Sequence, residues 1–159
     1  MTAASLPVLV QREGTWSYDG RVLLDEIAAM HALYLGVGGK SRFSPSDIST
    51  ARGRFLIART ARGEAVGCGA FRRLDFGVAE LVCIYSRMPN AGIGRAVLTG
   101  LESNAAKAGY HSLMVEMPRP NLSEQRFFWR MGFEPAFPTA ANLKPDQGLF
   151  MRKKVSEVR

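Results

Sequence analysis

The turn from Asn90 to Arg95 carries two glycines, Gly92 and Gly94, between an apolar run and a helical pattern. The first N–H groups of a helix have no partners within the helix, and the helix dipole adds partial positive charge there. Glycines let a phosphate approach the backbone without a Cβ in the way, and Arg95 adds a charged donor. The spacing therefore predicts an anion site, although a glycine-rich turn without a ligand has the same local pattern.

Two common nucleotide-binding patterns do not fit this turn. The dinucleotide-binding fingerprint has a third glycine where Val97 stands, and the sequence holds no Gly-x-x-x-x-Gly-Lys-Ser/Thr loop. We therefore expect the anion to belong to another class of cofactor.

Glu80 is the only carboxylate in the apolar run 78–86, a run typical of a central strand. Partial burial raises the pKa of a carboxyl towards neutrality, so Glu80 is a candidate general base. The structural alternative is a strand-end residue that pairs with Arg72 or Arg73. Glu116, in the strand pattern that follows, is the second candidate for the base.

The composition limits the classes of protein to which this sequence can belong. The 159 residues are 47% hydrophobic, which predicts one globular domain over residues 1–159. The net charge of +7 suits either a nucleic acid or a polyanionic small cofactor, and the scattered basic residues do not decide between them. Residues 1–7 lack a signal-peptide pattern and no apolar run of about 18 residues occurs, so we expect a cytoplasmic protein without a membrane partner.

The two cysteines, Cys68 and Cys83, form no CxxC motif and have no histidine cluster nearby. This predicts free thiols in a reducing compartment and no metal site. His31 shares an apolar helix face and His111 begins a strand pattern, so we expect both histidines to be structural.

Hydrophobic periodicity divides the chain into alternating elements. Strands are predicted over residues 8–12, 54–61, 65–74, 78–86, 111–117, 133–137 and 148–155. Helices are predicted over residues 21–35, 93–108 and 122–131, the first of them capped by Asp19 or Gly20. This order predicts a mixed α/β domain with a central sheet and helices on its faces.

Several segments occur together in one order. They are Ala79-Glu80-Leu81, the run from Gly92 to Leu98, Gly109-Tyr110, Asn121 and the run from Phe127 to Glu134. With these segments the chain resembles the GNAT superfamily of CoA-dependent N-acetyltransferases. The resemblance implies a mostly antiparallel central sheet that is splayed in the middle and flanked by helices.

The resemblance also implies how acetyl-CoA is held, with no metal. The pantetheine arm would pair with the exposed backbone around Ile84, Tyr85 and Ser86. The pyrophosphate would lie on the amides of Ala91, Gly92, Ile93 and Gly94, with Arg95 beside it. Asn121 matches a position that commonly contacts the CoA arm, and a plain helix cap is the alternative for it.

Two departures from the family pattern affect the chemistry. Pro89 stands where members carry Arg or Gln, and the loop between Ser86 and Gly92 is shorter than usual. Phe128 lies at a cofactor-contacting position where many members carry a tyrosine that acts as general acid. Tyr85 or Tyr110 is then the candidate acid. Glu80 resembles the strand glutamate of histone acetyltransferases in this superfamily.

These observations lead to three hypotheses. The first is an N-acetyltransferase in which a primary amine, on a small molecule or a protein lysine, attacks the acetyl group of acetyl-CoA directly. The second is a non-catalytic acetyl-CoA-binding or sensing domain, and the third a nucleic-acid binder. The acceptor pocket is expected among residues 36–50 and 138–147. Many members dimerise through sheet edges, so a homodimer is an open option.

Overall fold

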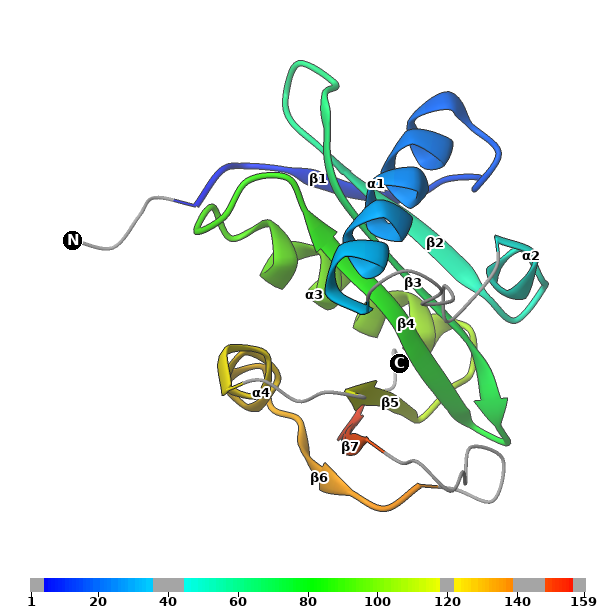
Figure 1. The fold of residues 1–159 in the computed structure, drawn as a ribbon. Helices are drawn as coiled ribbons and strands as arrows, with labels where there is room; N and C mark the ends of the chain where they lie inside the picture. The colour runs from blue at the N-terminus through cyan, green and yellow to red at the C-terminus, as the bar shows by residue number, and fades with distance from the viewer. Residues whose placement is uncertain (1–4, 36–44, 118–121, 139–147, 156–159) are drawn as a thin grey trace.

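The computed structural model describes residues 5–35, 45–117, 122–138 and 148–155. Their strands form one sheet in the order β1-β2-β3-β4-β5-β7-β6 (Figure 1). The strands are β1 (Leu9–Arg12), β2 (Arg54–Arg59), β3 (Ala65–Asp75), β4 (Val78–Ser86), β5 (Ser112–Met117), β6 (Glu134–Ala136) and β7 (Leu149–Lys154). Only the β4–β5 pair is parallel. The predicted mixed, mostly antiparallel sheet is confirmed, and β4 lies at its centre.

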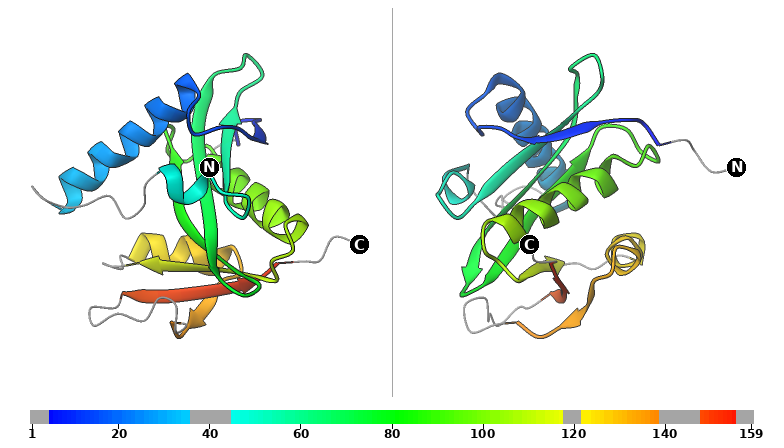
Figure 2. Two further views of the ribbon diagram at one scale, coloured as in Figure 1. Left: turned by 90° about the vertical axis from the view of Figure 1, so that its right-hand side faces the viewer. Right: turned by 180° about the vertical axis from the view of Figure 1, so that it is seen from behind.

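The helices are α1 (Tyr18–Leu35), α2 (Pro45–Ile48), α3 (Ile93–Lys107) and α4 (Leu122–Arg130). Figure 2 shows α1 on one face of the β1–β4 half of the sheet and α3 on the other. The alternation along β2 explains this arrangement, because Phe55 and Ile57 pack under α1 while Leu56 and Ala58 pack under α3. No described helix is both long and apolar enough to cross a bilayer.

The start of α1 differs from the sequence prediction. Ser17, and neither Asp19 nor Gly20, caps the helix: its Oγ accepts a hydrogen bond from the Gly20 N–H at 3.0 Å. The helix therefore begins at Tyr18, one turn earlier than the apolar periodicity indicated. Asp19 lies in the first turn and pairs with Arg59 of β2 at 2.9 Å.

Helix α3 follows the predicted apolar stripe. Ile93, Val97, Leu101 and Ala105 are buried against the sheet. The helix ends at Lys107, and Gly109 follows the C-cap residue Ala108 with a φ of 94° that favours glycine. Lys153 of β7 forms an ion pair with Glu102 of α3, which ties this strand to the helix.

The sheet opens beside β4 at one defined point. The β4–β5 pairing ends at Leu81 and Val115, whereas β4 stays paired with β3 as far as Ser86. At the same point Val82 is an extra residue on β4, because Leu81 lies opposite Phe71 and Cys83 lies opposite the adjacent Ala70. Such a bulge bends a strand and increases its twist. Beyond Val82, β4 and β5 therefore diverge, and the predicted splay is present (Figure 1).

Candidate functional site

The open edge of β4 exposes backbone hydrogen-bonding groups. The Arg87 N–H donates to the Val66 carbonyl at 2.8 Å, which fixes the alternation of the β3–β4 ladder. The backbone groups of Tyr85 therefore face β3, and those of Ile84 and Ser86 face the side that β5 has left. Of the three residues predicted to meet the pantetheine arm, two present to the opening main-chain groups that pair with no described residue.

A short turn carries the chain from this edge into α3. The Ser86 hydroxyl donates to the Met88 carbonyl at 2.8 Å and accepts from the Met88 N–H at 3.2 Å, so it shapes the turn. Asn90 and Gly92 both adopt left-handed backbone, with φ of 58° and 77°. The Ala91 carbonyl accepts a hydrogen bond from Leu6 at 2.8 Å, which places the N-terminal segment against the turn.

The N-terminus of α3 has no side-chain cap, because the N-cap residue is Gly92. The first helical hydrogen bond runs from Ala96 N to the Gly92 carbonyl at 3.1 Å. Among the described residues, no acceptor reaches the amides of Ile93, Gly94 and Arg95. Ile93 and Gly94 are two of the four residues whose amides were predicted to hold the anion, and the Arg95 side chain is exposed beside them. The anion site itself stays a prediction.

Packing within the protein does not require a glycine at position 94, beside these amides. A Cβ on Gly94 would lie 3.7 Å from Phe127 Cζ and 3.9 Å from Ile84 Cγ2, which are ordinary van der Waals distances. Phe127 of α4 thus borders the site together with Ile84. Phe127 was not among the predicted site residues, although it begins the run from Phe127 to Glu134 that resembles the family pattern.

Phe128 itself lies in the core. It is 4% exposed, and its ring makes edge-to-face contacts with Phe127 and Phe133, each at a centroid distance of 5.2 Å. This packing accounts for an aromatic residue at position 128 without a cofactor. The predicted cofactor contact of Phe128 stays a prediction.

Glu80 lies just before the bulge and is 8% exposed. Its carboxylate accepts a hydrogen bond from Arg72 Nη2 at 2.7 Å. The ion pair with Arg72 that sequence analysis offered as the alternative is therefore present. The contact with Arg72 fixes the orientation of the Glu80 carboxylate.

Side-chain alternation places the candidate acid–base groups on one face of the sheet. On β5, Leu113 and Val115 pack in the core under α3, so Glu116 lies on the opposite face. On β4, Leu81 also packs under α3, and Glu80 therefore shares the face of Glu116. The extra residue at the bulge shifts the alternation along β4 by one position, so Tyr85 lies on the same face as Glu80. There it packs against the core under α1.

The Tyr85 hydroxyl stays protonated in the folded protein. Burial raises its pKa above 10, and the negative charge of Glu26 on α1 raises it further. Glu26 is itself held by Arg87, whose Nη2 lies 2.6 Å from the carboxylate. The Tyr110 hydroxyl, the other candidate acid, donates to the Arg52 carbonyl at 2.7 Å, close to the C-terminal end of α3.

The remaining candidates lie outside this face or outside the described residues. The His111 ring packs on the β3–β4 turn, 1.9 Å from where a Cβ on Gly77 would stand. Asn121 and the side chain of His31 lie outside the described residues, as do most of the segments predicted to line the acceptor pocket. Cys68 and Cys83 are free thiols. Among the described residues, no three side chains group as metal ligands.

Comparison with known proteins finds a matching family model and solved structures with a similar fold. The model of the acetyltransferase (GNAT) family matches residues 24–133. No curated protein matches the sequence significantly.

Several solved structures are similar to this chain over most of its length. A protein from Klebsiella pneumoniae, described as an acyl-CoA N-acyltransferase, is 24% identical with a TM-score of 0.72, over 94% of this chain and 98% of that one. An acetyltransferase from Streptococcus agalactiae is 16% identical with a TM-score of 0.73, over 92% and 98%. A GNAT family acetyltransferase from Elizabethkingia anophelis, solved with acetyl-CoA bound, is 15% identical with a TM-score of 0.65, over 92% and 97%. At these identities the likeness establishes the fold.

Proposed function

The chain belongs to the GNAT acetyltransferase family, and from that premise we propose that it transfers an acetyl group from acetyl-CoA to a primary amine by direct attack. The acceptor amine belongs to a small molecule or to a protein lysine. One N-acetyltransferase domain over residues 1–159 carries the activity, in the cytoplasm and without a nucleic-acid or membrane partner. The two free cysteines are in keeping with a reducing compartment.

One observation carries this proposal: the open edge of β4 leads directly to the uncapped N-terminus of α3. The unpaired groups of Ile84 and Ser86 suit the amides of a pantetheine arm. The free amides of Ile93, Gly94 and Arg95 suit a pyrophosphate. An extended molecule with an amide-bearing arm and a diphosphate therefore matches the run of main-chain groups at this site.

When bound, acetyl-CoA supplies an activated thioester carbonyl. The residues of this chain orient that carbonyl against the amine and remove a proton from the nitrogen, because a protonated amine is not a nucleophile. Glu80 is our candidate for the proton acceptor, and Glu116 on the same face is the second. The Ile84 N–H on the open edge can stabilise the negative charge that develops on the carbonyl oxygen.

The thiolate that leaves needs a proton or a hydrogen bond. Tyr85 is our candidate donor, because its raised pKa keeps the phenol protonated and it shares a face with Glu80. Phe128 cannot serve, since it has no hydroxyl. A thiolate with a free pKa of about 8.5 is a tolerable leaving group, so the reaction tolerates a weak acid.

The absence of a hydroxyl at Phe128 also motivates a second candidate function. A domain that binds acetyl-CoA without turnover would use the same β4 edge and the same α3 amides. The two functions differ in one measurable respect, since only the enzyme releases free CoA in the presence of an amine.

The deciding experiment measures binding and turnover on the same preparation. Calorimetry with acetyl-CoA should show one site, and a thiol-release assay should show turnover with at least one class of amine, tested across polyamines, amino acids, aminoglycosides and lysine peptides. Binding without thiol release across the panel would favour the sensing domain. Absence of binding would refute both, and the monomer–dimer state can be measured on the same sample.

A further inference from the structure

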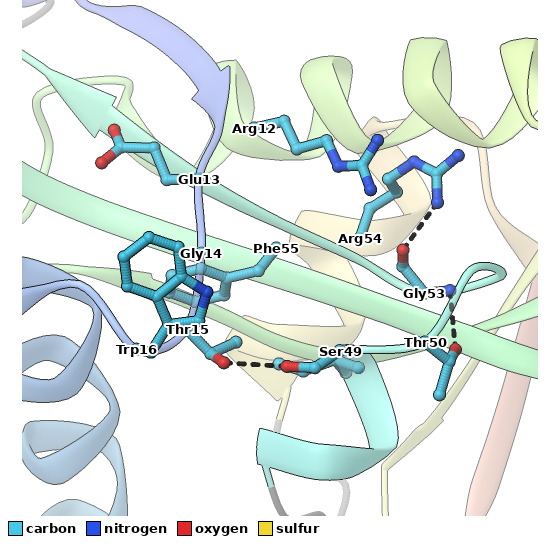
Figure 3. Close-up of a pocket in the computed structure, with 11 residues that line it drawn as sticks. Arg12, Glu13, Gly14, Thr15, Trp16, Ser49, Thr50, Gly53, Arg54 and Phe55 are labelled. Carbon is cyan, nitrogen blue, oxygen red and sulfur yellow. Dashed lines mark hydrogen bonds between the residues drawn. The ribbon is translucent and has the colours of Figure 1, made fainter.

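A second pocket lies away from the β4–β5 opening, where β1 parts from β2. Its volume is about 360 Å³, and its walls come from the end of β1, the segment before α1, the end of α2 and the start of β2. In Figure 3 the side chains of Arg12 and Arg54 lie next to each other on one side, and the indole of Trp16 lies across from them. None of the side chains proposed to carry out the acetyl transfer lines this pocket, although Ile48, Ser49 and Thr50 belong to the segment 36–50 in which the acceptor pocket was expected.

The positive charge of this pocket is not neutralised by the described residues. The nearest lining carboxylate, Glu13, has both oxygens engaged by Arg59, at 2.7 and 2.8 Å. No described carboxylate contacts Arg12 or Arg54. Arg54 donates to the carbonyls of Ala51 and Gly53, at 2.9 and 2.7 Å, which holds its guanidinium in place.

The two guanidiniums also act on each other. Burial and the charge of Arg12 both lower the pKa of Arg54, as expected for like charges that face a common space. An anion placed between them would relieve this repulsion. Hydroxyl groups add neutral donors, since Thr15 Oγ1 and Ser49 Oγ lie 2.8 Å apart on the pocket wall and either can turn its proton outwards.

Trp16 is exposed yet held in position. Its side chain is 79% exposed, but its indole lies so close to Gly14 that a Cβ there would stand 2.6 Å from the ring. The glycine therefore allows the ring to lie over the chain at the pocket rim. A flat apolar face opposite two guanidiniums suits a small molecule with an anionic head and an apolar body.

We propose that this pocket binds the phosphate group of a small molecule, with the phosphate between Arg12 and Arg54 and the remainder against Trp16. Two guanidiniums balance the double negative charge of a phosphate. Each planar guanidinium can also donate two hydrogen bonds to a pair of phosphate oxygens. The volume exceeds that of a phosphate alone and lies in the range of small-molecule sites. Inorganic phosphate and a phosphomonoester are the two sources of this chemistry.

The test uses Trp16 as the reporter. The protein contains two tryptophans, so a Trp129→Phe variant leaves Trp16 as the only tryptophan. Its fluorescence is titrated with phenyl phosphate, with inorganic phosphate and with phenol. We expect saturable changes with phenyl phosphate, and with inorganic phosphate if free phosphate is the natural source, and none with phenol.

Arg12→Gln is the decisive variant, because the Arg12 guanidinium supports no described contact and its loss leaves the fold intact. We expect it to weaken phenyl phosphate binding by about tenfold or more. Arg62→Gln, in the exposed β2–β3 turn, and Arg95→Gln, at the proposed pyrophosphate site, should change the affinity by less than about twofold. Equal affinity in Arg12→Gln, a response to phenol equal to that of phenyl phosphate, or no saturable signal would overturn the proposal.

Discussion

The Arg72 guanidinium donates two hydrogen bonds to the same carboxylate oxygen of Glu80, from Nε at 3.1 Å and from Nη2 at 2.7 Å. No described residue donates to the second oxygen, Oε2. Arg72 thus orients the carboxylate through Oε1, and among the described residues Oε2 has no donor. Glu80 stands one residue before the end of the β4–β5 pairing, next to the point where the two strands part.

Replacing Glu80 by Gln tests the role of this oxygen. The amide keeps the shape of the side chain but cannot take a proton, so we expect kcat to fall by about 100-fold or more. Glu64→Gln, in the exposed β2–β3 turn, is the matched control and should retain full activity. Unchanged activity in Glu80→Gln would reduce Glu80 to an ion-pair residue and transfer the role to Glu116.

Tyr85 can be tested through its hydroxyl alone. Tyr85→Phe keeps the ring that packs under α1, and we expect kcat to fall by about tenfold while the KM for acetyl-CoA stays constant. Since the pKa of Tyr85 is raised above 10, the wild-type rate should show no alkaline loss from this group below pH 10. Tyr18→Phe, at the exposed start of α1, is the control. A wild-type kcat in Tyr85→Phe would argue against an acid at this position.

A substitution at Gly94 tests cofactor binding without disturbing the stability of the fold. Because its Cβ would meet only ordinary contacts, Gly94→Ala should leave the free energy of unfolding unchanged or raise it by up to about 1 kcal/mol. The same methyl group would project beside the free amides, so the dissociation constant for acetyl-CoA should rise by about tenfold. Ser103→Ala, on the exposed face of α3, changes helix propensity without touching the site. Calorimetry in which both variants bind like wild type would refute the proposed pyrophosphate position.

The row formed by Phe127, Phe128 and Phe133 should dominate the stability of α4. Phe128→Ala removes a ring that is 4% exposed, and we expect a loss of about 3 to 5 kcal/mol in denaturant unfolding. Trp129→Ala on the same helix is the matched control. Its side chain is 70% exposed, so its effect should stay within about 0.5 kcal/mol. Similar losses in the two variants would contradict the described packing of α4.

The Cys83 thiol makes stability depend on alkaline pH. A hydrogen bond with Cys68 and then burial raise its pKa well above the ordinary value of 9.0, so the folded state holds this proton more tightly than the unfolded state. The stabilisation is complete below pH 9.0 and is lost as pH rises above it, by at most about 1.4 kcal/mol per pH unit.

Denaturant unfolding from pH 8 to 11 measures this slope. Wild type should lose stability more steeply above pH 9.0 than Cys83→Ala, which has no thiol to titrate at this position. Tyr85 and the other alkaline groups are common to both proteins and cancel in the comparison. Parallel curves would show that Cys83 contributes nothing to the pH dependence.

Local patterns sufficed for the elements and for the uncapped N-terminus of α3. The apolar stripe of α3 and the alternation of β2 follow from helix and strand periods, which each segment carries in itself. Gly92 and Gly94 marked the N-terminus of α3 because a free helix end and a missing Cβ are properties of a few consecutive residues. Ser17 was missed as a cap because its own segment offered Asp19 and Gly20 as equally good candidates.

What the sequence alone determined is therefore the kind and order of the elements and the identity of the turn that offers free amides. Tertiary structure decided where β4 and β5 part at Leu81 and Val115, that Arg72 rather than Arg73 holds Glu80, and that Phe127 borders the site. It also decided that Arg12 and Arg54 share a pocket. Each of these depends on strand register and on contacts between residues far apart in the chain, which no local period encodes.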